Sequence, residues 1–301
     1  MTSVEAIQRE RGIIGRNREL RRALAVLNSG RHLLLEGPVG VGKTRVALAV
    51  CAHLKRGVER VDGDDRYSES KLTGWFDPPV VLKQGYNEES FFAGPLVTAM
   101  REGKILFINE LNRMPETVQN VLLPALDEHI LQVPHIGEVR AVPGFQVVAT
   151  QNPVEYIATG HLSEALRDRF EHLRLDYQSA TEEEAIVSAE TGCDNLDLIR
   201  TAVRLARATR RHPLFRRGAS VRAPMSTVMV AEELRKADGR PAGQIDRATL
   251  WCAAEAGFTT RVHLRDESNM DFATAFGEVF ELVVDRGLDP DEVLTPPAPK
   301  V

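Results

Sequence analysis

Eight consecutive residues near the start of the chain have the types and spacing of a phosphate-binding loop. Glycines let backbone N–H groups converge on an anion, and a helix start adds unpaired donors and partial positive charge. Lys43 supplies a full positive charge for the outer phosphates, and Thr44 supplies a hydroxyl for Mg²⁺. The loop therefore predicts binding of ATP with Mg²⁺. Its residues match G-x-x-x-x-G-K-[ST] in full: Gly37, Pro38, Val39, Gly40, Val41, Gly42, Lys43 and Thr44.

A second polar group ends the apolar run Ile105-Leu106-Phe107-Ile108. In a parallel sheet the carboxyl ends of the strands line the ligand crevice, so this group should lie beside the phosphate loop. Glu110 is the candidate base that orients the attacking water and accepts its proton, and the alternative is that it caps the next helix. Asn109 stands where such sites usually carry an aspartate that helps to hold Mg²⁺. Because an amide oxygen is a weaker, neutral ligand, we expect slow turnover with nucleotide binding retained.

The elements that must position these residues alternate between strands and helices. The apolar run at 32–35 is typical of a buried parallel strand, with expected helices at 17–29 and 43–55 on either side of it. This alternation predicts an α/β fold with a mostly parallel sheet covered on both faces. The further expected elements are strands at 58–61, 105–108, 145–149 and 172–175 and helices at 95–103 and 115–129.

Two segments interrupt the alternation, and both should protrude from the sheet. Residues 73–92, around the run Val80-Val81-Leu82, favour a small β excursion. Residues 130–143 favour a hairpin that turns near 135–137. Pro124 lies inside the expected helix at 115–129, so a kink or break is expected there.

The pattern changes near residue 177, which predicts an α/β domain over 1–177 and a helical domain over 178–301. Thr181 and Glu184 have the spacing of a capping box at the start of the first helix of the second domain. Residues 295–301 contain three prolines and are expected to form a loose tail.

A basic stripe follows one helix of the second domain at helical spacing. A solvated face, an interface with an acidic neighbour, and a nucleic-acid contact all remain open as its role. The stripe consists of Arg200, Arg204, Arg207 and Arg211.

Composition narrows the class of protein. The 301 residues carry a formal net charge of −5, which argues against a protein that coats nucleic acid or an anionic membrane. No apolar run approaches the roughly 18–20 residues that span a bilayer, and the first residues are too polar for a signal peptide. Three widely spaced cysteines fit reduced thiols. A cytoplasmic location is therefore expected.

With these motifs, the sequence resembles the MoxR-type AAA+ ATPases, including the NorQ and CbbQ branch, over about Ile13–Arg235. The similarity is strongest over Gly94–Phe170. The resemblance implies a P-loop NTPase fold, with a three-layer αβα sandwich followed by an all-helical lid. The segment 73–92 resembles the insert in the second helix of this clade, and 130–143 resembles the hairpin before its sensor 1.

The resemblance also assigns roles to single residues. Asn152 matches sensor 1, although a turn asparagine before a proline is the plainer interpretation. Arg169 matches the arginine finger, which acts on ATP held by a neighbouring subunit, and Arg167 is the alternative. Ile14 falls in the N-terminal box near the adenine. Arg222 resembles sensor 2 of the lid, although the residue before it is valine where the family usually has proline.

The resemblance implies a homo-oligomeric ring, most often a hexamer, and a partner with a von Willebrand factor A domain. It further implies chaperone-like remodelling or activation of a client protein, including metal cofactor insertion into a metalloenzyme. One alternative is a nucleotide-gated binding switch with weak hydrolysis, which Asn109 favours. The other is an MCM-like nucleic-acid motor, which would need basic residues at the hairpin tip, where His135-Ile136-Gly137 carries little charge.

Overall fold

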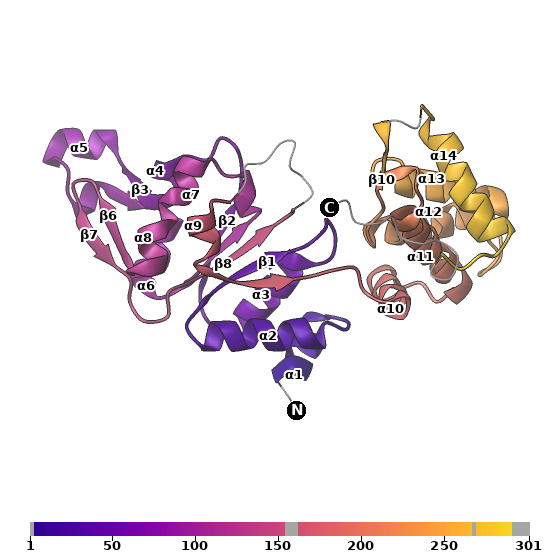
Figure 1. Ribbon diagram of the computed structural model, residues 1–301, viewed down its shortest axis with the longest axis horizontal. Helices are drawn as coiled ribbons and strands as arrows, with labels where there is room; N and C mark the ends of the chain where they lie inside the picture. The colour runs from indigo at the N-terminus through magenta and orange to yellow at the C-terminus, as the bar shows by residue number, and fades with distance from the viewer. Residues whose placement is uncertain (1–2, 154–161, 267–268, 291–301) are drawn as a thin grey trace. The chain divides into compact units, whose positions relative to one another are not determined.

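The computed structural model describes residues 3–153, 162–266 and 269–290, and the chain divides into two compact units, Met1–Asp176 and Tyr177–Val301 (Figure 1). Each unit has its own cluster of buried apolar side chains. The tail expected at 295–301 lies outside the described residues.

A five-stranded parallel sheet in the order β2-β5-β8-β1-β9 forms the centre of the first unit. Parallel neighbours require connections that cross a face of the sheet, and helices make those crossings here. The expected α/β fold with a mostly parallel sheet is therefore confirmed. The strands are β1 (His32–Glu36), β2 (Val58–Asp62), β5 (Ile105–Asn109), β8 (Gln146–Gln151) and β9 (Phe170–Arg174).

Helices cover both faces of this sheet. Successive strand residues point to opposite sides, so Leu106 and Ile108 join Leu96 and Met100 of α6 in one apolar cluster. Phe107 is buried on the other side, where α3 contacts β1, β5 and β8. The helices of this part are α1 (Ser3–Arg11), α2 (Asn17–Asn28), α3 (Lys43–His53), α6 (Pro95–Glu102), α7 (Glu116–Asn120), α8 (Leu122–Asp127) and α9 (Glu164–Arg167), with the short η2 (Leu111–Arg113) after β5.

The helix expected at 115–129 is broken into α7 and α8, as anticipated, but the break lies at Val121 and not at Pro124. Pro124 is the third residue of α8. In the first turn of a helix a backbone N–H has no intrahelical partner, so a proline there removes no hydrogen bond. The break therefore precedes the proline.

The segment expected to form a β excursion does so only in part. Strands β3 (Gly74–Phe76) and β4 (Phe91–Ala93) pair as an antiparallel ribbon, following α4 (Glu69–Thr73). The run 80–82, however, lies in helix α5 (Pro78–Gln84), so its expected β structure was wrong. Pro78 opens that helix and Gly85 ends it, and these two signals outweighed the β-branched side chains. The short η1 (Glu88–Ser90) leads into β4.

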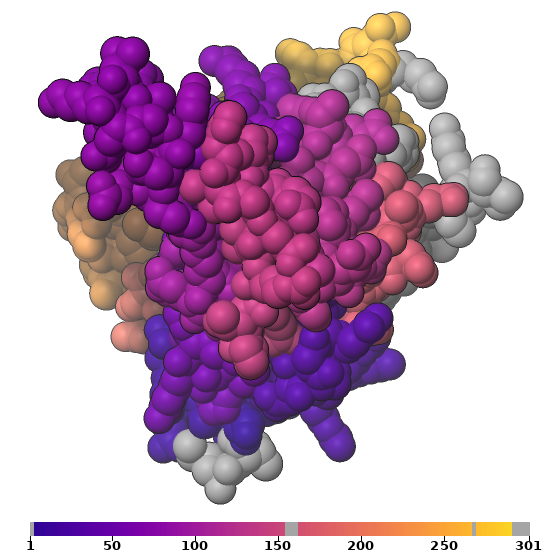
Figure 2. Space-filling view, turned by 90° about the vertical axis from the view of Figure 1, so that its left-hand side faces the viewer, coloured from indigo at the N-terminus to yellow at the C-terminus, as the bar shows by residue number. Residues whose placement is uncertain are grey.

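The insert (residues 73–92) packs against the tip of a hairpin formed by β6 (Ile130–Val133) and β7 (Gly137–Arg140). The ring of His135 stacks on Tyr86 at 4.2 Å and meets the edge of Phe76 at 5.8 Å. Trp75 and Phe92 stack on each other at 4.9 Å, although each is about half exposed, at 51% and 50%. Figure 2 looks onto the end of the first unit that carries both segments, where the purple insert stands out at the edge.

The second unit is helical, with one small antiparallel ribbon added. Its apolar core gathers side chains from α11, α12, α13 and α14. No helix among the described residues combines the length and the hydropathy needed to cross a bilayer. The elements are α10 (Ala180–Thr191), α11 (Leu196–Arg211), β10 (Phe215–Arg217), α12 (Arg222–Ala237), α13 (Arg247–Phe258), β11 (His263–Leu264), α14 (Phe272–Phe280) and the π-helical η4 (Glu281–Asp285).

The first helix of this unit starts two residues earlier than expected. Ser179, not Thr181, is the N-cap, and its hydroxyl accepts the backbone N–H of Glu182 at 3.3 Å. Glu182 in return accepts the backbone N–H of Ser179 at 3.1 Å. Two S/T-x-x-E patterns overlap here, and the earlier one forms the reciprocal pair.

The basic stripe on α11 is paired within its own unit. Arg200 lies 3.7 Å from Glu184, and Arg204 lies 3.5 Å from Asp289. Arg207 and Arg210 converge on Glu183, whose side chain is only 4% exposed. Arg211 donates to the carbonyl of Pro290 at 2.8 Å. These arginines are therefore partnered by groups of the same chain.

His32, at the start of β1, is a buried neutral histidine. The backbone N–H of Val147 donates to its Nδ1 at 3.0 Å, so its Nε2 carries the proton and donates to the carbonyl of Leu126 at 3.2 Å. Burial lowers the pKa of His32 to about 4 from an ordinary 6.5. The folded protein thus resists protonation that the unfolded chain accepts.

This histidine predicts a loss of stability in acid. The stabilising effect of a neutral His32 is fully present above about pH 6.5 and is lost as the pH falls toward about 4, by about 3 kcal/mol in total. In His32→Gln, the free energy of unfolding should fall less between about pH 7.5 and 4.5 than in the parent. Chemical denaturation of both chains at each pH measures the difference. Parallel pH profiles would contradict the assignment.

A candidate nucleotide-binding site

The predicted phosphate loop joins β1 to α3, and α3 begins at Lys43. A Cβ added to Gly37 would lie 2.1 Å from the carbonyl oxygen of Leu175, so only glycine fits at this position. Gly42 adopts a φ of +89° just before the helix, where the left-handed region favours glycine. The Lys43 ammonium donates to the carbonyls of Gly37 and Pro38 at 2.7 and 2.8 Å. Backbone carbonyls of the loop therefore hold the Lys43 ammonium.

Arg16 supports the phosphate loop through hydrogen bonds to backbone carbonyls. It is 7% exposed, and its Nη2 donates to the carbonyls of Val41 at 2.9 Å and Asp176 at 2.6 Å. Ile14, expected near the adenine, is half-buried in the same segment between α1 and α2. The sequence showed the N-terminal box but gave no sign that its arginine supports the loop, because the partners are backbone carbonyls far along the chain.

The end of β5 meets the phosphate loop through hydrogen bonds. The Oδ1 atom of Asn109 accepts from the hydroxyls of Thr44 at 2.8 Å and Thr150 at 3.0 Å. The Thr150 hydroxyl also accepts the backbone N–H of Glu110 at 2.9 Å. The structure therefore brings Thr44, Asn109 and Glu110 to one edge of the sheet. Thr150 was missed from the sequence, and its position near the carboxyl end of a neighbouring strand was the signal that could have found it.

Asp62 is a second residue that the sequence did not reveal. It ends β2 directly beside Asn109 in the sheet register, and its Oδ1 accepts from the Nδ2 of Asn109 at 2.9 Å. Arg60 donates to both of its carboxylate oxygens, at 2.9 and 3.1 Å. The guanidinium of Arg60 holds the pKa of the Asp62 carboxyl below its ordinary value, with a smaller contribution from Asn109.

The candidate base Glu110 has an uncommon backbone conformation. Its φ and ψ are 57° and 52°, a left-handed conformation that costs about 1–3 kcal/mol for a residue with a side chain. Its side chain makes no capping hydrogen bond to η2 and instead pairs with Arg113 at 2.9 Å. A Cβ on Gly63 would lie 2.1 Å from the Glu110 carbonyl oxygen, so the turn also requires a glycine on the neighbouring segment.

Asn152 follows β8, which lies next to β5, the strand that ends one residue before Glu110. It is 4% exposed, and its carbonyl accepts from the Nδ2 of Asn112 at 3.4 Å. Its position beside the end of β5 is compatible with the sensor 1 role, which stays a prediction. Arg222 is the exposed first residue of α12 and belongs to the second unit.

The two candidate finger arginines lie at the opposite edge of the sheet. Arg169 directly precedes β9, whose first residue Phe170 is in register with His32 at the start of β1. Its guanidinium donates to Asp127 at 2.6 Å and to the carbonyl of Ala165. Arg167 is the exposed last residue of α9. Because the phosphate loop follows the other end of β1, Arg169 cannot reach its own chain's site.

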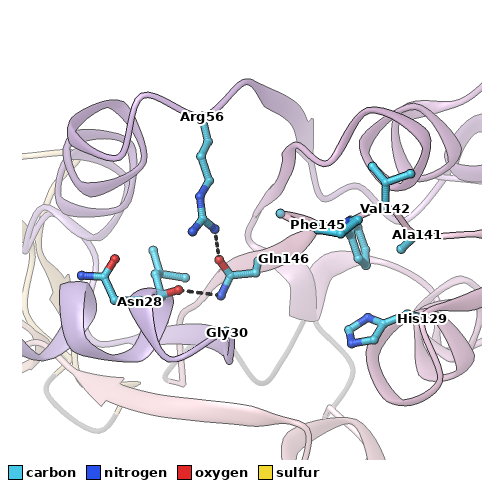
Figure 3. A pocket seen from close by; sticks show the side chains of 11 residues that line it. Asn28, Gly30, Arg56, His129, Ala141, Val142, Phe145 and Gln146 are labelled. Carbon is cyan, nitrogen blue, oxygen red and sulfur yellow. Dashed lines mark hydrogen bonds between the residues drawn. The ribbon is translucent and has the colours of Figure 1, made fainter.

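A cavity of about 370 Å³ also lies at this amino-terminal edge (Figure 3). Gln146 donates to the carbonyls of Leu27 and Arg31 at 3.1 and 2.7 Å, and Arg56 donates to Gln146. His129 and Val142 line the cavity on another side. Gln146 begins β8, whereas the polar groups described above gather where the strands end. The cavity is therefore separate from the candidate site.

Comparisons with known proteins agree with this geometry. Residues 32–170 match the family described as AAA domain, dynein-related subfamily. An uncharacterized protein of Staphylococcus epidermidis is 32% identical over 222 residues, which are 70% of this chain and 83% of that protein. The gas vesicle ATPase GvpN of Ancylobacter aquaticus is 31% identical over 227 residues, 70% of this chain and 63% of GvpN. NorQ of Paracoccus denitrificans is 35% identical over 175 residues, 56% of this chain and 63% of NorQ.

The chain belongs to the MoxR-type AAA+ ATPases.

The solved structures support the fold of this AAA+ ATPase. RuvB of Thermotoga maritima matches 93% of this chain and 85% of its own, with a TM-score of 0.56 and 17% sequence identity. At that identity the likeness concerns the fold alone. This chain spans less than two thirds of the length of GvpN and of NorQ.

Proposed function

We propose that this AAA+ ATPase hydrolyses ATP with Mg²⁺ in a ring and uses the cycle to remodel or activate a partner protein. The observation that supports this most directly is the contact between the phosphate loop and the end of β5, made by Thr44, Asn109 and Thr150. It brings the candidate base Glu110 to the edge where a γ-phosphate would end.

The groups at this edge fit Mg²⁺ and a nucleotide. The glycine cradle would be filled by a single Cβ, and backbone N–H groups and Lys43 suit the phosphates. Thr44 and Asn109 offer the oxygen atoms that Mg²⁺ prefers. Held by Thr44 and Asn109, Mg²⁺ would offset the negative charge of the nucleotide phosphates. Glu110 would orient the water and accept its proton, and Asn152 would hydrogen-bond the γ-phosphate or that water.

The positions of the remaining predicted residues are compatible with a ring of subunits. Arg169, at the opposite edge from its own phosphate loop, would act on ATP bound by the next subunit, with Arg167 as the alternative. Ile14 would contact the adenine, and Arg222 of the helical unit would act as sensor 2. A hexamer, a partner with a von Willebrand factor A domain and a client such as a metalloenzyme are proposed from membership of the family.

A nucleotide-gated binding switch is the second candidate function. Two observations favour it: Asn109 brings no charge to the metal, and the Glu110 carboxylate is held by Arg113 at 2.9 Å. In a switch, nucleotide binding alone would change affinity for the partner. An MCM-like motor is less favoured, because the hairpin turn at 134–136 carries no lysine or arginine and its His135 ring stacks on Tyr86 of the insert.

Turnover with and without Glu110 separates motor from switch. In Glu110→Gln, we expect ATP hydrolysis to fall at least about 100-fold, because the amide cannot accept the proton, while nucleotide affinity stays within about threefold. Phosphate release and fluorescent-nucleotide binding measure the two quantities.

Glu116→Gln is the matched control, because Glu116 is an exposed carboxylate at the start of α7. A parent chain that binds ATP tightly without turnover would support the switch. Turnover that Glu110→Gln leaves unchanged would reject Glu110 as the base.

A further inference from the structure

The polar residues at the end of β5 are completed by a carboxylate from the neighbouring strand. We propose that Asp62 is the positioning residue of the Mg²⁺ site and that Asp62 and Asn109 together do the work of the single aspartate that such sites usually carry. This inference rests on the proposed function, because it concerns how the same site holds Mg²⁺ with the nucleotide.

Hydrogen bonds fix which way the Asn109 amide points. Thr150 accepts the N–H of Glu110, so its own hydroxyl proton is directed to the Oδ1 of Asn109. On the other side, the Nδ2 of Asn109 donates to the Asp62 carboxylate at 2.9 Å. A flipped amide would place Oδ1 against that carboxylate and lose the hydrogen bonds from Thr44 and Thr150 as well as the one to Asp62. Asp62 therefore keeps the Asn109 oxygen turned toward Thr44, where Mg²⁺ is expected.

The hydrogen bond from Asn109 to Asp62 also polarises the Asn109 amide. A hydrogen bond to an ionised carboxylate is stronger than one between neutral groups, and linked hydrogen bonds polarise one another. The Asn109 oxygen thus becomes a better ligand than an isolated amide. Arg60 donates to both oxygens of Asp62, which holds the carboxylate in place at the end of β2.

The contact between Asp62 and Asn109 predicts the outcome of Asn109→Asp, the variant that would restore the aspartate usually found at this position. In the parent, the Asn109 amide nitrogen is 2.9 Å from the Asp62 oxygen. A carboxylate at position 109 would replace that hydrogen bond with repulsion between like charges. The single change is therefore expected not to improve the site. The exchanged pair, D62N with N109D, restores one carboxylate and one amide in contact.

The test compares binding of fluorescent ADP in EDTA and across a Mg²⁺ titration at fixed ionic strength. Asp62→Ala should lower the apparent Mg²⁺ affinity of the ADP complex about 10-fold or more, with binding in EDTA unchanged. Asp62→Asn should recover part of the loss, because its carbonyl can still accept from Asn109. N109D alone should be no better than the parent, and the exchanged pair should equal or exceed the parent.

Asp65→Ala is the matched control, because Asp65 is an exposed carboxylate in the loop that follows β2, and its partner is Arg66. The inference is overturned if Asp62→Ala has the Mg²⁺ dependence of this control, or if N109D alone surpasses the exchanged pair. In either case a parent that binds ADP in a Mg²⁺-dependent way leaves the proposed function standing. A parent that binds no nucleotide with or without Mg²⁺ overturns both.

Discussion

Replacing Arg169 by alanine should lower ATP turnover by about 10³- to 10⁵-fold, the range that positioned arginines contribute to phosphoryl transfer. Arg169 precedes β9 at the amino-terminal edge of the sheet, whereas the phosphate loop follows the carboxyl end of β1. The lost rate enhancement would therefore be that of a neighbouring subunit. Nucleotide affinity should change little, and the lost pairs with Asp127 and Ala165 should cost at most about 1 kcal/mol of stability.

Mixing two inactive variants tests whether the arginine acts between subunits. Lys43→Ala removes the phosphate-loop charge but leaves Arg169 intact, and Arg169→Ala has the converse defect. A mixture of the two should regain turnover that neither shows alone, measured as phosphate release against the mixing ratio. Arg167→Ala is the comparison variant, because Arg167 is the alternative candidate for the finger. If Arg167→Ala loses the activity and Arg169→Ala keeps it, the roles of the two arginines are reversed.

Replacing Glu183 by alanine should destabilise the helical unit by about 3–5 kcal/mol, because two largely enclosed arginines lose the buried partner that they share. Glu183 contacts Arg210 at 2.8 and 3.0 Å and Arg207 at 3.1 Å. The side chains of Arg207 and Arg210 are 14% and 11% exposed, so water cannot fully replace the carboxylate.

Denaturation followed by the fluorescence of Trp251 reports this loss in the unit concerned. The chain has two tryptophans, and the other, Trp75, lies in the insert, so a Trp75→Phe background leaves Trp251 as the only reporter. Glu184→Ala should cost under about 1 kcal/mol, because Glu184 pairs with the half-exposed Arg200 at 3.7 Å. Equal effects of the two changes would show that burial of Glu183 is not what matters.

Features encoded in short, contiguous patterns could be predicted from the sequence. The strand before the phosphate loop, the loop itself and the strand ending at Asn109 each carry their signal within a few residues. The start of α10 shows that even a local pattern can misplace a helix start by two residues. Ser179 and Thr181 both begin a capping pattern, and only the competition between two overlapping hydrogen-bond pairs decides which of them forms.

Contacts between strands could not be predicted in this way. Asp62 and Thr150 reach Asn109 because β2 and β8 flank β5, and that order depends on crossovers that no local pattern encodes. Arg16 bonds to backbone carbonyls, which leave no trace in residue types. The helix at 78–84 was missed for the opposite reason, since its β-branched side chains indicated a strand while the flanking proline and glycine set the backbone.

The ring stack between Tyr86 and His135 connects the insert to the hairpin that leads into β8. His135 sits at the turn between β6 and β7, and the chain runs from β7 through residues 141–145 directly into β8. Along the way Val142 is anchored to the carbonyl of Met100 in α6 at 2.9 Å. A load applied to the insert would thus be transmitted along the hairpin to the strand that holds Thr150, the residue whose hydroxyl links Asn109 to Glu110.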